Sequence, residues 1–321
     1  MKTYPFGTSR AFCLENDLLK VTLISFGARI TNLEFCGKDL VIGYDDLEGF
    51  QNSTVYPGAI IGRYANRIAN GRFELNGKVY QLGKNENDVT NLHGGPIGFD
   101  MMEWDSTVES ENSVSFSRIS PDGEMGFPGT VRVKVTYTLE EDALKIDYDA
   151  DTDADTFLSL TNHVYFNLDG YDGEDCRNMK LMLRAPWYLP VDDKLIPSGE
   201  IRSVSGTVFD FTEEKTIGTD FDHCFVLGMD RKYQNAGRLY SEKTGIAMEI
   251  ETDMPSVQFY SSGFLSDTVG KGGIPLHLHQ AVALETQLFP DSPNHDNFPS
   301  TLLKPGEKFK STTRYRFSKV Q

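Results

Sequence analysis

His163 and Glu285 are the two side chains in this 321-residue sequence that are best suited to move protons. Each lies in a short run with the composition of a strand, residues 161–167 (TNHVYFN) and 284–287 (LETQ), so each can point away from a packed apolar layer. The usual pKa values of about 6.5 for His and about 4.3 for Glu allow a partly protonated imidazole beside a carboxylate near neutral pH. The pair predicts general acid–base chemistry that needs no cofactor.

A second group of polar residues could hold the molecule on which such a pair acts. It comprises Asn66, Arg67, His93 within the segment 92–95 (LHGG), and Asp222. Amide, guanidinium, imidazole and carboxylate groups together supply both donors and acceptors for hydroxyl groups. A polyhydroxylated ring could be held by these groups while one oxygen gains a proton and another loses one. The combination indicates sugar chemistry.

Strand alternation predicts that these polar side chains share a surface. Because successive side chains of a strand point to opposite faces, His163 and Tyr165 fall on the same face. In the later segments, the same rule places Gln258 and Glu285 opposite apolar neighbours such as Leu284. We therefore expect polar groups from separate strands to converge on one cleft.

The elements that must position these residues are predicted to be strands. Residues 131–139 alternate strictly between apolar and polar side chains, the pattern of a half-buried strand. Residues 73–80 predict a hairpin, because Asn76-Gly77 supplies the two positive-φ residues of a tight turn. No sustained helical periodicity and no nucleotide-binding glycine motif is present. The expected fold is all-β, a large antiparallel β-sandwich in a single domain over residues 1–321.

Composition narrows the classes of partner. The net charge of −16 disfavours nucleic acid and anionic membrane surfaces, which bind clustered cations, and favours a neutral ligand.

The N-terminal residues lack the apolar run of a secretory signal, and no segment is apolar for long enough to cross a bilayer. Four irregularly spaced cysteines (Cys13, Cys36, Cys176 and Cys224) fit free thiols in a reducing compartment. We expect a cytoplasmic protein.

Two segments could suggest a metal. Residues 149–155 are acidic but lack the glycine and terminal glutamate of a calcium-binding EF-hand loop, so a solvated turn between strands is expected there. His277 and His279 would share a strand face, but no further ligands stand at suitable spacing. The sequence therefore predicts neither a metal nor another cofactor.

Longer strings of residues carry a more specific signal. They are residues 62–71 (GRYANRIANG), 91–95 (NLHGG), 98–100 (GFD), 126–129 (GFPG), 161–168 (TNHVYFNL), 221–223 (FDH), 255–260 (PSVQFY) and 284–287 (LETQ). Through these strings, in order and over nearly its whole length, the chain resembles the aldose 1-epimerases, also called galactose mutarotases. The resemblance implies the galactose mutarotase-like β-supersandwich.

The resemblance also implies roles for the candidate residues. His163 looks like the general acid and Glu285 like the general base of a reaction that opens a cyclic hemiacetal, allows rotation about C1–C2 and closes it again. The expected sugar-binding residues are Asn66, Arg67, His93, Tyr165, Asp222 and Gln258. The expected partner is a small aldose, bound by a monomer or a homodimer. Arg67 could instead pair structurally with a carboxylate.

Other functions remain open from the sequence. A noncatalytic sugar-binding module would need the binding residues but no acid and base. A hexose-6-phosphate epimerase of the same fold would need cations gathered at one end of the cleft, and no such cluster is obvious. A glycoside hydrolase normally places two carboxylates about the scissile bond, whereas the candidate pair here is His163 and Glu285.

Overall fold

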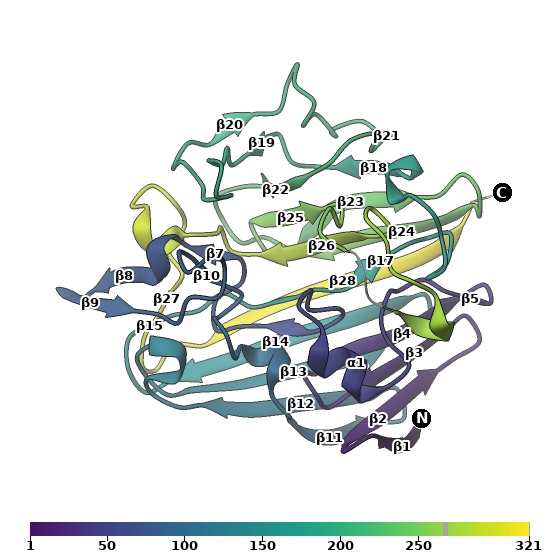
Figure 1. The fold of residues 1–321 in the computed structure, drawn as a ribbon, viewed down its shortest axis with the longest axis horizontal. Helices are drawn as coiled ribbons and strands as arrows, with labels where there is room; N and C mark the ends of the chain where they lie inside the picture. Colours follow the sequence, from purple (N-terminus) through teal and green to yellow (C-terminus); the bar gives the residue numbers. More distant parts are fainter. Residues whose placement is uncertain (266–268, 321) are drawn as a thin grey trace.

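The computed structural model describes residues 1–265 and 269–320, and strands make up nearly all of its regular structure (Figure 1). Within these residues the framework consists of three larger antiparallel sheets, of nine, six and five strands. The only α-helix described is α1 (Leu47–Asn52), which begins where the Asp46 side chain accepts a hydrogen bond from the Gly49 N–H. The predicted all-β fold is confirmed.

The nine-stranded sheet is the long back layer of the molecule, and β28 crosses its middle (Figure 1). Consecutive strands form one half as a meander, because each needs only a short turn to pair with the next. In spatial order the strands are β11 (Asp105–Ser110), β12 (Ser113–Ser120), β13 (Val131–Leu139), β14 (Ala143–Thr152), β28 (Phe309–Lys319), β24 (Ile246–Thr252), β23 (Gln234–Tyr240), β18 (Lys180–Leu183) and β21 (Lys215–Thr216).

The two other large sheets form the facing layer. The five-stranded sheet runs β1 (Lys2–Phe6), β2 (Ser9–Glu15), β3 (Leu19–Ile24), β4 (Arg29–Phe35) and β5 (Lys38–Asp39). The six-stranded sheet runs β17 (Tyr165–Phe166), β26 (Val282–Gln287), β25 (Ser256–Tyr260), β22 (Asp222–Val226), β19 (Trp187–Tyr188) and β20 (Arg202–Ser203).

Smaller elements join these layers. The two-stranded pairs are β6 (Ile60–Ile61) with β16 (Thr161–Asn162), β7 (Arg67–Ile68) with β10 (Asn91–Leu92), β8 (Arg72–Leu75) with β9 (Lys78–Gln81), and β15 (Thr156–Phe157) with β27 (Leu302–Leu303). Single 3₁₀ turns are η1 (Ala69–Gly71), η2 (Phe99–Met101), η3 (Glu124–Gly126), η4 (Cys176–Asn178), η5 (Lys271–Gly273) and η6 (Ser292–Asn294). Among the described residues, no helix has the length and apolar character required to span a bilayer.

Aromatic side chains fill the space between the layers. Phe12 of β2 meets Phe116 of β12 edge to face, with ring centroids 5.6 Å apart. On the other half, Phe166 of β17 meets Tyr315 of β28 at 5.0 Å, and the Tyr315 hydroxyl donates to the Leu284 carbonyl. These contacts belong to one continuous buried core that includes residues of all three large sheets. The core holds β17, which follows the predicted acid, and β26, which contains the predicted base.

Two local predictions are confirmed in detail. Strand β13 buries its valines and exposes Arg132 and Lys134, as the alternation predicts. The hairpin β8–β9 turns at Asn76 and Gly77, whose φ angles are 53° and 74°. Both residues therefore adopt the left-handed conformation that a two-residue turn between twisted strands requires.

The predicted turn at residues 149–155 is wrong in its first half. Asp149 and Asp151 lie in β14, on the face where they meet cationic neighbours of adjacent strands. Lys308 Nζ lies 2.6 Å from Asp151 Oδ2, and Arg132 Nη1 lies 3.0 Å from Asp151 Oδ1. Cross-strand ion pairing lets a carboxylate-rich segment remain a strand, which the local sequence alone does not reveal.

Candidate active site

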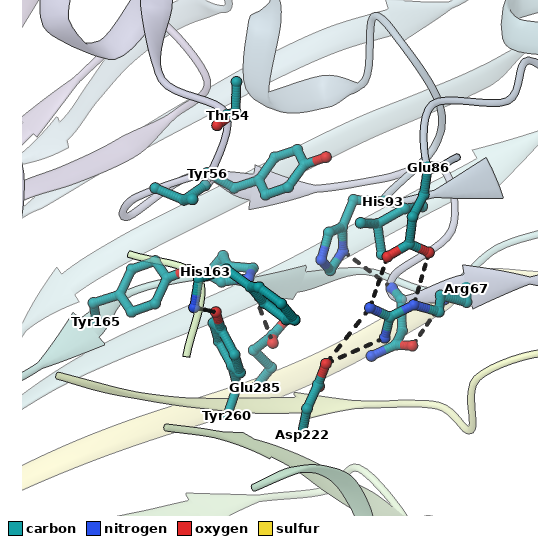
Figure 2. A pocket seen from close by; sticks show the side chains of 14 residues that line it. Thr54, Tyr56, Arg67, Glu86, His93, His163, Tyr165, Asp222, Tyr260 and Glu285 are labelled. Atoms are coloured by element: carbon teal, nitrogen blue, oxygen red, sulfur yellow. Dashed lines mark hydrogen bonds and ion pairs between the residues drawn. The ribbon is translucent and has the colours of Figure 1, made fainter. Parts of the chain in front are cut away.

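One open pocket contains seven of the eight predicted site residues (Figure 2). It lies where the β7–β10 region, the β16–β17 segment and the six-stranded sheet approach one another. The predicted residues that line it are Asn66, Arg67, His93, His163, Tyr165, Asp222 and Glu285, and the others are Thr54, Val55, Tyr56, Glu86, Leu92, Tyr260 and Phe264. The predicted convergence of polar groups is therefore found.

His163 and Glu285 face each other in this pocket, with His163 Nε2 3.6 Å from Glu285 Oε1. Glu285 projects from β26, which lies between β17 and β25. His163 lies in the break between β16 and β17, where its backbone N–H donates to the Ala59 carbonyl and its carbonyl accepts from the Gly58 N–H. Both side chains are almost completely buried, at 5% and 2% exposure.

Burial changes the protonation of this pair from the sequence-based expectation. It raises the pKa of Glu285 well above its usual value, and Asp222 adds to the rise while Arg67 opposes it. Burial lowers the pKa of His163 to about 4. Burial therefore favours the uncharged forms of both groups, the carboxylic acid of Glu285 and the neutral imidazole of His163. Moving a proton from Glu285 to His163 gives the carboxylate and imidazolium that the sequence predicts.

Arg67 and Asp222 form a charged wall beside the pair. Arg67 lies in β7 and Asp222 begins β22, so the fold brings together residues far apart in the sequence. Nη1 of Arg67 lies 3.5 Å from Oδ2 of Asp222, at the outer limit of a hydrogen bond. Arg67 also makes two shorter bonds to Glu86. Arg67 therefore pairs with carboxylates, as the alternative interpretation of the sequence predicts, and it also lines the pocket.

His93 is held as a neutral hydrogen-bond donor. Its Nδ1 accepts the backbone N–H of Asn66 at 3.1 Å, so the proton of the neutral ring is carried by Nε2. Burial lowers the pKa of His93 well below its usual value, and the nearby His163 and Arg67 lower it further. Gly94 follows with φ at 93°, and a Cβ there would lie 2.0 Å from the Gly62 carbonyl oxygen. The LHGG segment therefore needs glycine at this position.

Gln258 is the predicted site residue that does not line the pocket. It pairs directly with Glu285 across β25 and β26, and its side chain is buried. Its Nε2 donates to Asp222 Oδ1 at 2.6 Å. Gln258 thus fixes the orientation of the Asp222 carboxylate from behind, and direct binding of a sugar by Gln258 stays a prediction.

Comparisons with known proteins show the family and the fold of the chain. The sequence model of the family described as aldose 1-epimerase matches residues 10–316. The chain is 43% identical to galactose mutarotase from Bos taurus, over 97% of this chain and 95% of that protein. It is 38% identical to aldose 1-epimerase from Escherichia coli, over 96% and 95%. The crystal structure of an aldose epimerase homologue from C. elegans superposes with a TM-score of 0.92 at 35% identity, covering 98% of this chain and 100% of the other.

The chain belongs to the aldose 1-epimerase family. The supersandwich fold implied by the sequence resemblance is thereby confirmed. In this family member Arg67, Glu86 and Asp222 lie to one side of the acid–base candidates, and Asp222 lies between Arg67 and Glu285 (Figure 2).

Sequence reasoning missed several lining residues of this aldose 1-epimerase family pocket. Tyr56 packs its ring against His93 and His163, with centroids 4.7 and 5.7 Å apart. Glu86 clamps Arg67, and Phe264 lies 68% exposed at the mouth. Tyr56, Glu86 and Phe264 lie in loops without a periodic pattern. Their local sequences offered no signal beyond an aromatic or a charged residue.

Three lining residues could in principle approach a metal ion. The candidate ligand atoms of His93, His163 and Glu285 lie within 4.8 Å of one another. The tautomer of His93 opposes this use, because Nδ1 is occupied by the Asn66 N–H and Nε2 carries the proton. Outside the pocket, no group of ligands around His277 is found in the described residues. The donor set fits hydrogen bonding to hydroxyls better than metal coordination.

Proposed function

We propose that this protein interconverts the α and β anomers of hexoses such as galactose and glucose, with His163 as the general acid and Glu285 as the general base. The enzyme class, an isomerase of the aldose 1-epimerase type, follows from family membership. One observation supports the residue roles most strongly: the two groups meet at 3.6 Å in a buried pocket whose other polar groups can hold hydroxyls.

The proposed reaction needs only two proton transfers in each direction. The Glu285 carboxylate takes the proton of the anomeric O1 while protonated His163 gives its proton to the ring oxygen O5. The C1–O5 bond breaks, the C1–O1 bond becomes a carbonyl, and the ring opens. After rotation about C1–C2, O5 attacks the other face of C1 and returns its proton to His163. O1 recovers a proton from Glu285, so the enzyme ends as it began.

The proximity of the pair supports this chemistry, because His163 Nε2 lies 3.6 Å from Glu285 Oε1 and both groups can reach one bound ring. A positioned general acid or base typically raises a rate by roughly 100- to 10,000-fold. His93 Nε2 and Arg67 Nη1 can donate to the oxygens on which negative charge develops, and Asp222 can accept from ring hydroxyls.

The alternatives are less well supported. A noncatalytic sugar-binding module has no need of the buried pair of His163 and Glu285, which is costly to keep next to an open pocket. A phosphosugar epimerase needs free cations. Among the lining residues that the structure describes, Arg67 is the only Arg or Lys, and it already contacts Glu86 and Asp222.

Polarimetry of freshly dissolved α-galactose and α-glucose tests the proposed function. We expect the approach to the equilibrium rotation to accelerate in proportion to enzyme concentration. An unchanged decay would contradict the proposal and favour the binding module. As a control, a nitrophenyl glycoside should release no free sugar, because it lacks the O1 hydroxyl proton that Glu285 must take; release would favour a hydrolase.

We propose a cytoplasmic enzyme that acts as one domain over residues 1–321, as a monomer or homodimer, on small sugars and not on nucleic acid or membranes. The free cysteines support the reducing compartment: Cys13, Cys176 and Cys224 are buried and Cys36 is exposed. The net charge of −16 supports a neutral substrate.

A further inference from the structure

Glu86 lines the pocket, but the acid–base mechanism gives it no role. Its carboxylate binds Arg67 at two points, since Arg67 Nε donates to Oε2 and Nη2 donates to Oε1, both at 2.9 Å. The Arg67 side chain is 6% exposed and the Glu86 side chain 24% exposed. A two-point bond between a planar guanidinium and a carboxylate fixes the plane of the guanidinium as well as its position.

The loop that carries Glu86 is tied to the pocket wall. The Asn85 side chain accepts the Leu92 N–H at 2.8 Å and donates to the Leu92 carbonyl at 3.0 Å. Next to it, the Glu86 N–H donates to the Thr90 carbonyl at 3.3 Å, which closes the loop at its base. These bonds hold the Glu86 backbone against β10, so its carboxylate has a defined place opposite Arg67.

The two hydrogen bonds from Arg67 to Glu86 determine which edge of Arg67 remains for a ligand. Glu86 accepts from Nε and from one N–H of Nη2, and Nη1 makes no bond to Glu86. The remaining contacts, from Nη1 and Nη2 to Asp222 Oδ2, are both 3.5 Å long and therefore weak. A sugar hydroxyl placed there can accept from Nη1 and donate to Asp222, which gives two short bonds in place of long ones.

The charge of Glu86 also bears on the base. Arg67 lowers the pKa of Glu285 against the effects of burial and of Asp222. Burial would lower the pKa of Arg67 itself, but Asp222 and Glu86 outweigh burial and raise it, so both carboxylates stabilise this cation. The other titratable groups that act on or lie beside Glu285 are His93, His163, Tyr165 of β17, Cys224 of β22, Tyr260 of β25, Tyr148 of β14 and Tyr315 of β28. Among the neighbours named, Arg67 is the permanent cation.

We propose that Glu86 is a positioning residue for anomer interconversion: it sets which edge of Arg67 meets the sugar and limits how strongly that cation stabilises the Glu285 carboxylate. The inference rests on the proposed function. It assigns Glu86 no contact with the reacting atoms, and it makes the strength of the base depend on a carboxylate that acts through Arg67.

Two substitutions separate the geometric effect from the electrostatic effect. Glu86→Gln removes the charge, so we expect a KM about tenfold higher and both limbs of the pH profile of kcat/KM displaced to lower pH by roughly one unit. The displacement is toward lower pH because removing a negative charge favours the carboxylate of Glu285 and disfavours the imidazolium of His163. Glu86→Asp keeps the charge but is too short to keep both bonds, so we expect a higher KM with the limbs in place.

Glu124→Gln is the matched control. Glu124 pairs with Arg118 at 2.7 Å with side-chain exposures of 15% and 5%, and neither residue lines the pocket. We expect this variant to keep the wild-type KM and pH profile. If the wild type is active and Glu86→Gln has an unchanged KM and an unchanged pH profile of kcat/KM, the inference is overturned. If Glu86→Asp displaces the pH profile as far as Glu86→Gln does, the electrostatic part of the inference is overturned. An inactive wild-type enzyme would instead overturn the proposed function.

Discussion

Replacing Glu285 by Gln is expected to lower kcat for anomer interconversion by roughly 100- to 10,000-fold, the usual contribution of a positioned base. The amide keeps the shape of the side chain but cannot take the O1 proton. Polarimetry of fresh α-galactose measures the loss. Calorimetric titration of the sugar serves as the control, and we expect affinity within a few-fold of the wild type, since Arg67, His93 and Asp222 are untouched.

The same variant is expected to be more stable than the wild type at neutral pH. The folded-state pKa of Glu285 is raised, so the stability associated with this group is fully present below the unfolded pKa near 4.5 and is lost as pH rises toward the folded value. The amide that replaces this carboxyl does not titrate, so the stability advantage should appear only above pH 4.5 and widen with pH. Near-normal turnover in a correctly folded variant would remove Glu285 from the role of base.

Replacing His163 by Asn is expected to lower kcat by a similar factor of roughly 100 to 10,000, because the amide cannot deliver a proton to O5. The measurement is again the rate of change of optical rotation with fresh α-galactose. Since His163 packs against Tyr56 and Tyr165, with ring centroids 5.7 and 4.9 Å apart, circular dichroism should accompany it. Full activity in a variant with a native spectrum would exclude His163 as the acid.

A pH series of unfolding experiments provides an independent check on His163. Its folded-state pKa of about 4 lies below the usual 6.5. Between these two pH values the unfolded chain binds a proton at this residue and the folded chain does not. The wild type should therefore lose about 3 kcal/mol of stability from this group as pH falls from 6.5 to 4. The Asn variant should lose less over the same range. Parallel curves for the two proteins would contradict a buried neutral imidazole.

Much of the fold was accessible from the sequence because strand periodicity is local. The alternation over residues 131–139 and the Asn76-Gly77 turn each appear in the structure as predicted. The prediction of a turn at residues 149–155 is wrong for the residues within β14, because the cations that keep Asp149 and Asp151 in this strand come from other strands and loops. Pairing across a sheet is a property of the tertiary fold, and the isolated segment does not encode it visibly.

The candidate site, like the fold, is predictable from the sequence only in part. Tyr165 and Glu285 lie in strands, where alternation fixes the direction of each side chain. His163 lies instead in a break between β16 and β17, which the continuous strand-like run over residues 161–167 does not predict. The protonation of the pair could not be predicted, because it depends on burial created by the whole fold. Glu86 could not be predicted either, since only the folded loop shows that it meets Arg67.

The most direct test of the central claim is the polarimetric kcat of the double variant His163→Asn/Glu285→Gln beside the two single variants. If one acid and one base act as a unit on the same bound ring, removing the first already disables the second. We predict that the double variant is no slower than the slower single variant, within about threefold. A loss equal to the product of the two single losses would contradict the paired mechanism.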